Sequence, residues 1–224
     1  MANQLTARVL SRYLDGVMIR TFGHEIVEEF AQYASIPVIN ALTDLLHPCQ
    51  ALTDLLTAQE HKGKDLKGLK MAYIGDGNNM THSLMYACAK VGMNFASASP
   101  KGYEPNAQVV ANAKLDAAQS GSTIEILNDP SEAAKDADIL YTDVWASMGQ
   151  EAEHDERVKI FKDYQINNEL LRVADKRAIV MHCLPAHRGE EIAEDVLEKN
   201  ANVIFDEAEN RLHTQKAIMA LLMG

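Results

Sequence analysis

The sequence predicts an α/β fold, with a doubly wound, Rossmann-like parallel-sheet domain preceded by a partial second α/β domain. From Leu69 onward, short apolar runs typical of buried strands alternate with runs of helical periodicity. Such alternation implies a parallel sheet with helices on both faces. Before that point the same alternation contains only two clear strands, and an open two-stranded parallel unit buries little apolar surface. We therefore expect a partial domain over residues 1–64 and a second domain over residues 65–224. The final helix of the second domain can pack back on the first domain.

The first unit is expected to be the back half of a domain whose front half is absent, because the chain opens inside a helical pattern. No low-complexity linker separates the two units, so Lys62-Gly63-Lys64 is the best boundary. Helix, strand, helix, strand and helix are expected in turn over residues 6–13, 16–20, 25–33, 37–40 and 48–61.

The second unit begins with a strand over residues 70–74, which leads into a glycine-containing turn. Pro130 opens a short helix, because proline is favoured in a first turn, where its missing N–H needs no partner. The other strands are expected over residues 94–99, 123–127, 138–144, 178–181 and 203–205, and the other helices over 80–90, 107–119 and 164–174.

Composition limits the class of protein. The 224 residues are 47% hydrophobic and 24% charged, as in an ordinary globular protein, and their net charge of −11 argues against nucleic-acid binding. The three cysteines are widely spaced, which fits neither a disulfide framework nor a zinc motif and indicates a reducing compartment. No apolar run approaches the roughly 20 residues of a membrane span, and the N-terminus does not look like a signal peptide. A cytoplasmic protein is expected.

The tetrapeptide His182-Cys183-Leu184-Pro185 directly follows the expected strand 178–181. Open α/β sheets bind ligands at the carboxyl ends of their strands, so a thiol and a turn at this place indicate a reaction centre. The alternative is a buried cysteine followed by a turn-forming Leu-Pro pair.

Polar side chains follow both strands of the first unit. Arg20 ends one strand, and His47 and Gln50 follow the other. Arginine offers a rigid fork of donors for phosphate or carboxylate, and the other two could polarise a carbonyl oxygen. The alternative is a surface arginine beside a helix-starting His-Pro.

The run Gly75-Asp76-Gly77-Asn78-Asn79 lies where a strand turns into a helix and suggests a dinucleotide site. Position 80 is methionine instead of the third glycine, and the next strand end carries no acid for a ribose. We therefore reject a nucleotide cofactor. Asn79 is interpreted as a carboxylate-binding group or as a helix cap.

Two further strand ends carry charge. Asp143 could hold an ammonium group, and the polar stretch that follows it to Arg157 is long enough for a mobile lid. The alternative is an ordinary surface loop. After the expected strand 203–205, Arg211 is either anchored by the preceding acids or reaches the site.

Taken together, these motifs resemble the ornithine carbamoyltransferases of the aspartate/ornithine carbamoyltransferase superfamily, from Thr6 to the end of the chain. The His-Pro-x-Gln pattern indicates the superfamily, whereas His-Cys-Leu-Pro and Ser-Met-Gly indicate ornithine. In chain order the motifs are Met18-Ile19-Arg20-Thr21, His47-Pro48-Cys49-Gln50, Gly75-Asp76-Gly77-Asn78-Asn79, Asp143 through Met148-Gly149, and the tetrapeptide followed by Glu207-Ala208-Glu209-Asn210-Arg211.

The resemblance implies carbamoyl transfer from carbamoyl phosphate to the side-chain amine of L-ornithine, giving L-citrulline and phosphate, by a homotrimer without metal or cofactor. Catalysis would fall to Arg20, His47 and Cys183. Implied carbamoyl-phosphate ligands are Arg20, His47, Gln50, Arg211 and the backbone carbonyls of Cys183 and Leu184. Implied ornithine ligands are Asn79, Asp143, Ser147 and Met148.

One family feature is missing. The Ser-x-Arg-Thr loop that cradles the phosphate does not occur, and Met18 stands where its serine would be, two residues before Arg20. We therefore expect little transferase activity from this chain alone, and a weakened assembly. The alternatives are a non-catalytic amino-acid-binding or regulatory homologue, or a carbamoyltransferase for another amine such as putrescine.

Overall fold

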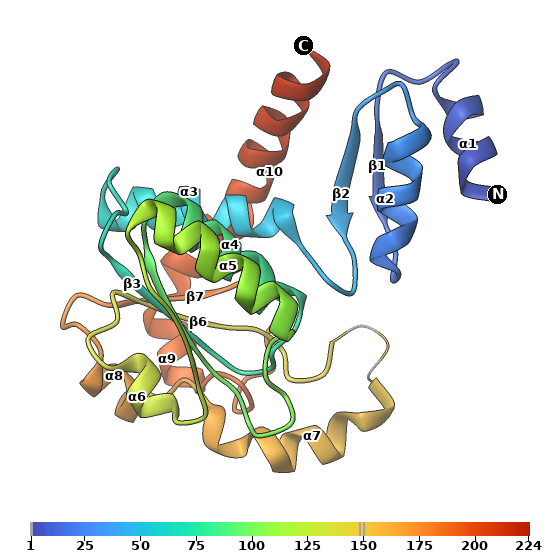
Figure 1. The fold of residues 1–224 in the computed structure, drawn as a ribbon. Coiled ribbons are helices and arrows are strands. Elements are labelled where there is room, and N and C mark those ends of the chain that lie inside the picture. The colour runs from blue at the N-terminus through green and yellow to red at the C-terminus, as the bar shows by residue number, and fades with distance from the viewer. Residues whose placement is uncertain (1, 148, 150) are drawn as a thin grey trace.

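Two parallel sheets organise the molecule and confirm the α/β class (Figure 1). The computed structural model describes residues 2–147, 149 and 151–224. A two-stranded sheet pairs β1 (Val17–Arg20) with β2 (Val38–Leu42), and a five-stranded sheet has the order β5-β4-β3-β6-β7. Every pairing among these strands is parallel.

The small sheet lies to one side of the large one, with α1 and α2 beside it (Figure 1). The helices of this unit are α1 (Ala2–Leu10), α2 (His24–Tyr33) and α3 (Pro48–Lys62). The register between the strands shifts between Ile19 and Arg20. Unlike α1 and α2, α3 leaves the small sheet and packs against α4 and α10 of the second unit.

The second unit follows the predicted alternation. Its strands are β3 (Lys70–Ile74), β4 (Asn94–Ala98), β5 (Ile124–Leu127), β6 (Ile139–Thr142) and β7 (Ile179–His182). Its α-helices are α4 (Asn79–Val91), α5 (Ala107–Ser120), α6 (Pro130–Ala134), α7 (His154–Phe161), α8 (Asn168–Val173), α9 (Glu194–Lys199) and α10 (Ala201–Met223), and the 3-10 turns are η1 (Glu151–Glu153) and η2 (Lys162–Tyr164).

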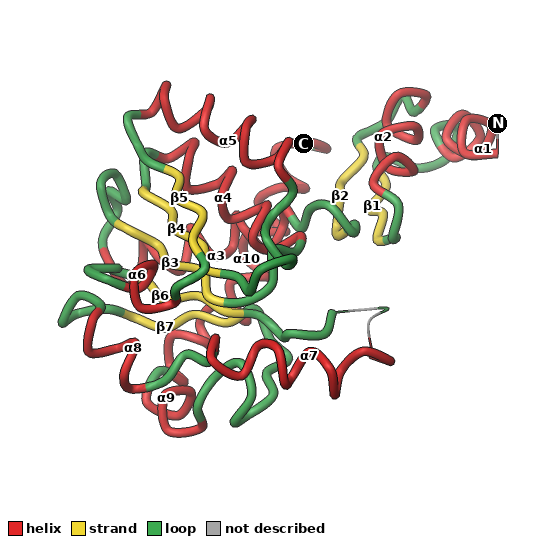
Figure 2. Tube along the Cα trace, turned by 60° about the horizontal axis from the view of Figure 1, so that its bottom comes forward, coloured by secondary structure: helices red, strands yellow, loops and turns green. Residues whose placement is uncertain are grey.

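Alternate residues of each central strand enter different cores. In β3, Met71 and Tyr73 pack into one apolar cluster, whereas Ala72 and Ile74 pack into another. This is the two-residue period of a strand buried on both faces. Figure 2 shows α4 and α5 on one side of the sheet and α6, α8 and α9 on the other. The predicted doubly wound arrangement is therefore confirmed.

Capping residues define both ends of α4 and α5, the two helices whose predicted bounds agree well with the structure. The side chains of Asn78 and Asn106 each accept two backbone N–H groups at the starts of α4 and α5. Gly92 and Gly121 end the same helices in the left-handed conformation that glycine adopts without strain. Because both ends carry such residues, the sequence located these two helices to within one or two residues.

The predicted strand at residues 203–205 is wrong, because these residues belong to α10. The buried positions of this helix are Val203, Ile204, Glu207 and Asn210. That spacing is helical. It becomes visible in the sequence only when the polar residues Glu207 and Asn210 are counted as buried positions together with the two apolar residues.

Other differences concern short helices. The helix predicted over residues 164–174 begins only at Asn168, after the turn η2, and neither α7 nor α9 was predicted. Each of these α-helices has six to eight residues, which is too short for a clear 3.6-residue pattern.

The last helix returns to the first unit. The Asn210 side chain donates to Thr57 Oγ1 at 3.1 Å and to Glu60 Oε2 at 2.6 Å, so buried polar contacts join α10 to α3. Across the described residues, no helix combines the length and the apolar character needed to cross a bilayer.

Candidate active site

A cleft of about 910 Å³ lies between the small sheet and the carboxyl ends of the large one. The chain order of the strands reverses between β3 and β6, and open α/β sheets bind ligands at such a switch point. Met148 lies outside the described residues. Every other predicted site residue lines the cleft, namely Arg20, His47, Gln50, Asn79, Asp143, Ser147, Cys183, Leu184 and Arg211.

His47 is held in its neutral form at the first turn of α3. Its backbone N–H donates to Ser83 Oγ at 2.6 Å, and the residue is only 6% exposed. Burial, followed by the charges of Arg211 and Arg20, lowers the pKa of this imidazole to about 3. Nδ1 is buried without a hydrogen-bond partner among the described residues. The favoured tautomer therefore carries its proton on Nε2, since a buried N–H on Nδ1 would have no acceptor.

Gln50 holds Arg211 in place. Its side-chain oxygen accepts from Arg211 Nη1 at 2.6 Å, and its Nε2 donates to Asp54 Oδ1 at 2.8 Å. A weaker contact of 3.4 Å joins the same Nε2 to Glu207 Oε1. Since both ends of the amide are engaged, Gln50 in this structure orients the guanidinium across the boundary between α3 and α10.

Behind Gln50, Asp54 and Glu207 form a fully buried carboxyl pair. Glu207 accepts from the Tyr141 hydroxyl at 3.1 Å and from the backbone N–H of His182 at 2.9 Å. Burial raises the pKa of Asp54 to about 7, and burial together with the Asp54 charge raises that of Glu207 well above its usual range. Two carboxyl groups in one desolvated site cannot both ionise easily, so the pair shares a proton near neutral pH.

The Cys183 thiol faces Asp143. Its Sγ donates to Asp143 Oδ1 at 3.2 Å. The other carboxylate oxygen accepts from the Asn78 side chain at 3.2 Å. Burial, and then the negative charge of Asp143, raises the pKa of the thiol well above its usual value. Cys183 is therefore a protonated donor in this site and not a thiolate.

Asn78 caps α4, whereas Asn79 contacts the loop after β2. Asn78 is the N-cap of α4, so the interpretation of Asn79 as a cap is wrong. Asn79 is the first residue of the helix, and its Nδ2 donates to the Thr43 carbonyl at 2.7 Å in the loop after β2. Asn78 also lies 3.4 Å from Ser147 Oγ and so joins the cap to the polar wall of the cleft.

The His182 imidazole supports the tetrapeptide from behind. It is fully buried, its Nε2 lies 3.1 Å from Glu191 Oε1, and its Nδ1 accepts the Leu184 N–H at 2.9 Å. Leu184 has φ 55°, a left-handed conformation that is rare for a branched side chain. Such conformations persist where surrounding contacts impose them, often at ligand sites; here the contact is made by His182.

The stretch after Asp143 is anchored at its far end. Arg157 is buried, and its Nη1 lies 2.8 Å from Asp76 Oδ2 and 2.7 Å from the Trp145 carbonyl. Its guanidinium also stacks 5.1 Å from the centre of the Tyr103 ring. A lid that extends to Arg157 does not fit these contacts, because that residue is part of the packed α7.

Gly77 has a packing role. A Cβ there would lie 2.3 Å from the backbone carbon of Glu104 and from the nitrogen of Pro105. The glycine is required because another loop crosses at this point.

Sequence reasoning did not single out Asp54, and it named Asn78 and Glu207 only as members of longer motifs. Asp54 stands four residues after Gln50, on the same face of α3, which is a signal that could have found it. Glu207 was masked by the false strand, since helical spacing would have turned it inward with Val203 and Ile204.

Comparisons with known proteins find similar chains along nearly the whole length. Residues 67–222 match the family described as aspartate/ornithine carbamoyltransferase, Asp/Orn binding domain, and residues 3–60 match its carbamoyl-P binding domain. The ornithine carbamoyltransferase of Thermococcus kodakarensis is 59% identical over 98% of this chain and 69% of the relative. That of Anoxybacillus flavithermus is 62% identical over 97% of this chain and 69% of the relative. The solved ornithine carbamoyltransferase from Pyrococcus furiosus superposes with a TM-score of 0.94 at 54% identity, over 99% of this chain and 71% of that one.

Proposed function

Because the chain belongs to the aspartate/ornithine carbamoyltransferase family, we propose that it carbamoylates the side-chain amine of L-ornithine, giving L-citrulline and phosphate. The observation that carries this proposal is the cleft at the switch point, lined by residues of all five motifs. In the reaction the amine forms a bond to the carbonyl carbon while the bond from that carbon to the phosphate oxygen breaks. The amine loses one proton in this step, and that proton offsets the negative charge gained by the released phosphate.

The positive groups of the cleft suit the carbonyl and phosphate end of carbamoyl phosphate. The neutral His47 can donate from Nε2 to the carbonyl oxygen, and the guanidinium groups of Arg20 and Arg211 can stabilise the charge that develops there. Preorganised donors of this kind typically contribute about 10²–10³ in rate each. Gln50 would act on carbamoyl phosphate chiefly by fixing Arg211, as its hydrogen bonds indicate.

The Asp143 end of the cleft suits the amino-acid substrate. An alkyl amine has a pKa of about 10.4 and must lose a proton before it attacks. Asp143 would pair with the α-ammonium, with Asn79, Ser147 and Met148 holding the rest of the substrate. The protonated Cys183 would orient Asp143 and the attacking amine, because its raised pKa keeps the thiol protonated and so unable to accept the proton of the amine.

Citrulline formation by the purified chain, with carbamoyl phosphate and ornithine supplied, tests the proposal. We expect ornithine-dependent turnover that Arg20→Met and Asp143→Asn each abolish, and slower turnover with putrescine. Since the 224 residues contain no Ser-x-Arg-Thr motif, the expected rate is low. Calorimetric ornithine binding without any citrulline would instead support the non-catalytic alternative, and a preference for putrescine would change the assigned amine.

We further propose that the protein acts in arginine metabolism, in the biosynthetic direction or in a urea cycle, as a cytoplasmic homotrimer. The three free cysteines fit a reducing compartment. Large apolar side chains are exposed on the small unit, including Leu5, Tyr13 and Met18, each more than 60% exposed. Exposed apolar surface of this kind is typical of an interface. Sedimentation equilibrium checks the assembly, and a monomer at all concentrations would contradict it.

A further inference from the structure

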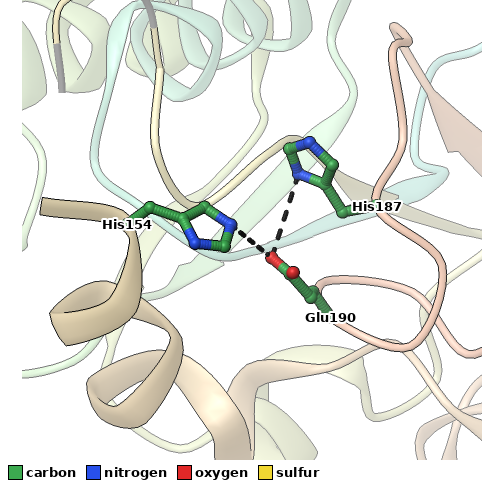
Figure 3. Close-up of side chains that lie close together, drawn as sticks. All are labelled: His154, His187 and Glu190. Carbon is green, nitrogen blue, oxygen red and sulfur yellow. Dashed lines mark hydrogen bonds and ion pairs between the residues drawn. The ribbon is translucent and has the colours of Figure 1, made fainter. Parts of the chain in front are cut away.

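Three side chains from two separate segments meet at the rim of the cleft. His154 begins α7, and His187 and Glu190 follow the tetrapeptide after β7. Figure 3 shows both imidazole rings beside one carboxylate oxygen, with Glu190 Oε2 lying 3.1 Å from His154 Nε2 and 3.9 Å from His187 Nδ1. The three candidate ligand atoms lie within 4.8 Å of one another. Segments far apart in the chain therefore present three metal-ligating groups to one point.

The spacing of these atoms is close to that of a zinc site. Zinc binds imidazole nitrogen and carboxylate oxygen at about 2.1 Å in a tetrahedron, which places neighbouring ligand atoms about 3.4 Å apart. The contact between His154 and Glu190 already has about this length, and the contact of His187 with Glu190 needs to shorten by about half an ångström. The two histidine nitrogens lie within 4.8 Å of each other and must also approach. All three side chains are partly exposed, with 36%, 46% and 27% of their side-chain surface accessible, so small rotations are possible and an ion can enter.

The charges around the cluster also favour a cation. Among the described residues, the ion-pair partners of Glu190 are the two histidines and no lysine or arginine. The nearby Arg188 is engaged with Glu194 and Glu198 instead. His187 Nδ1 also lies 3.9 Å from Glu191 Oε2, a buried oxygen that accepts no hydrogen bond in the described part of the chain. A divalent ion would balance this excess of carboxylate.

The outer contacts fit a metal site as well. The second ring nitrogen of His154, Nδ1, lies 3.5 Å from Asp155 Oδ1. Metal-bound histidines commonly direct their free ring nitrogen to a carboxylate, which fixes the orientation of the ring. Two imidazoles and one carboxylate select zinc and similar transition ions over magnesium or calcium, which prefer oxygen ligands alone.

We propose that His154, His187 and Glu190 bind one Zn²⁺ ion at the rim of the cleft, with a fourth position open to water. The ion would join the first turn of α7 to the loop that follows Pro185. Since His187 itself lines the cleft, the ion would lie beside the entrance used by the substrate. This site is separate from the proposed carbamoyl transfer, and its test does not depend on activity.

Calorimetric titration of the whole chain with zinc chloride tests the proposal, and the absorption of bound Co²⁺ reports the coordination geometry. We expect one ion per chain and a tetrahedral cobalt spectrum. Loss of a residue that hydrogen-bonds to a metal ligand typically weakens metal binding by about 10–100-fold. His154→Gln and Glu190→Gln remove a ligand itself, so each should weaken zinc binding by more than that. His213→Gln is the matched control, because His213 contacts Glu209 on α10 in a similar exposed pair.

Three results would overturn the site. The first is the absence of zinc binding tighter than millimolar. The second is equal affinity in His154→Gln, Glu190→Gln and the unaltered chain. The third is binding that Cys183→Ser removes while His154→Gln leaves it intact, which would place the ion on the thiol and carboxylate inside the cleft. Circular dichroism of each variant confirms that a loss of binding is not a loss of fold.

Discussion

Two replacements of Glu207 separate the contribution of its shape from that of its charge in the buried pair with Asp54: alanine removes both, and glutamine removes only the ionisable group. Glu207→Ala removes the acceptor of the Tyr141 hydroxyl and of the His182 backbone N–H. Each buried donor left without a partner costs about 1–3 kcal/mol, so we expect a loss of about 2–6 kcal/mol in the free energy of unfolding. Glu207→Gln keeps one acceptor oxygen, so only one of the two donors loses its partner, and the expected loss is about 1–3 kcal/mol.

The same variant changes the pH dependence of stability. Burial raises the pKa of Asp54 to about 7, from 3.8 in the unfolded chain. The folded protein therefore binds more protons than the unfolded one between these values, so this contribution is complete below pH 3.8 and is lost as the pH rises to about 7. At about 1.4 kcal/mol for each pH unit and proton, the loss from pH 5 to pH 7 is at most about 3 kcal/mol. Glu207 also has a pKa raised well above its usual value and adds a loss of the same sign. In Glu207→Gln an amide replaces this acid, so its share disappears and the total loss shrinks.

Urea denaturation at pH 5, 6, 7 and 8 measures both effects. Burial lowers the pKa values of His47 and His82, which makes stability rise with pH over the same range. These histidines are common to all variants, so the difference between variants isolates the carboxyl pair. Glu209→Gln, on the exposed side of α10, is the control and should change little. Equal losses in Glu207→Ala and Glu207→Gln, or an unchanged pH dependence in Glu207→Gln, would refute the shared proton.

Three further predictions concern single side chains. Arg157→Met leaves the buried Asp76 carboxylate without its ion pair and should cost about 3–5 kcal/mol; a melting temperature within a degree of the unaltered chain would contradict this. His47→Asn should lower kcat by about 10²–10³. Because the pKa of His47 is about 3, its titration should contribute no step near pH 6.5 to the pH profile of kcat/KM, and the variant should leave that region of the profile unchanged. Cys183→Ala should lower turnover and ornithine affinity by removing the donor to Asp143; unchanged kinetics in an active protein would exclude Cys183 from the mechanism.

Strand ends were the part of the site most open to prediction. Cys183 and Asp143 follow apolar runs, and parallel strands of one sheet place their carboxyl ends at one edge, so the proximity of these two followed from pattern alone. Arg20 ends a strand of the other sheet, and only the tertiary structure brings it to the same cleft. Asn79 was given a role from the sequence and Asn78 was not, although either asparagine could cap a helix that starts one residue later. Only the backbone conformation at Asn78, which is extended, decides between them.

The sequence by itself determined the α/β class, both sets of strands in the correct order apart from the false strand at 203–205, and a part of the residues that line the cleft. It could do so because burial period, helix caps and turn residues are local properties. Tertiary structure alone decided which polar groups are buried together. Gln50 and Arg211 join α3 to α10, and the pKa of Glu207 is raised by burial and by the charge of Asp54, which lies far away along the chain. Desolvation and pairing depend on what the other segment brings to the same place, and no local pattern carries that information.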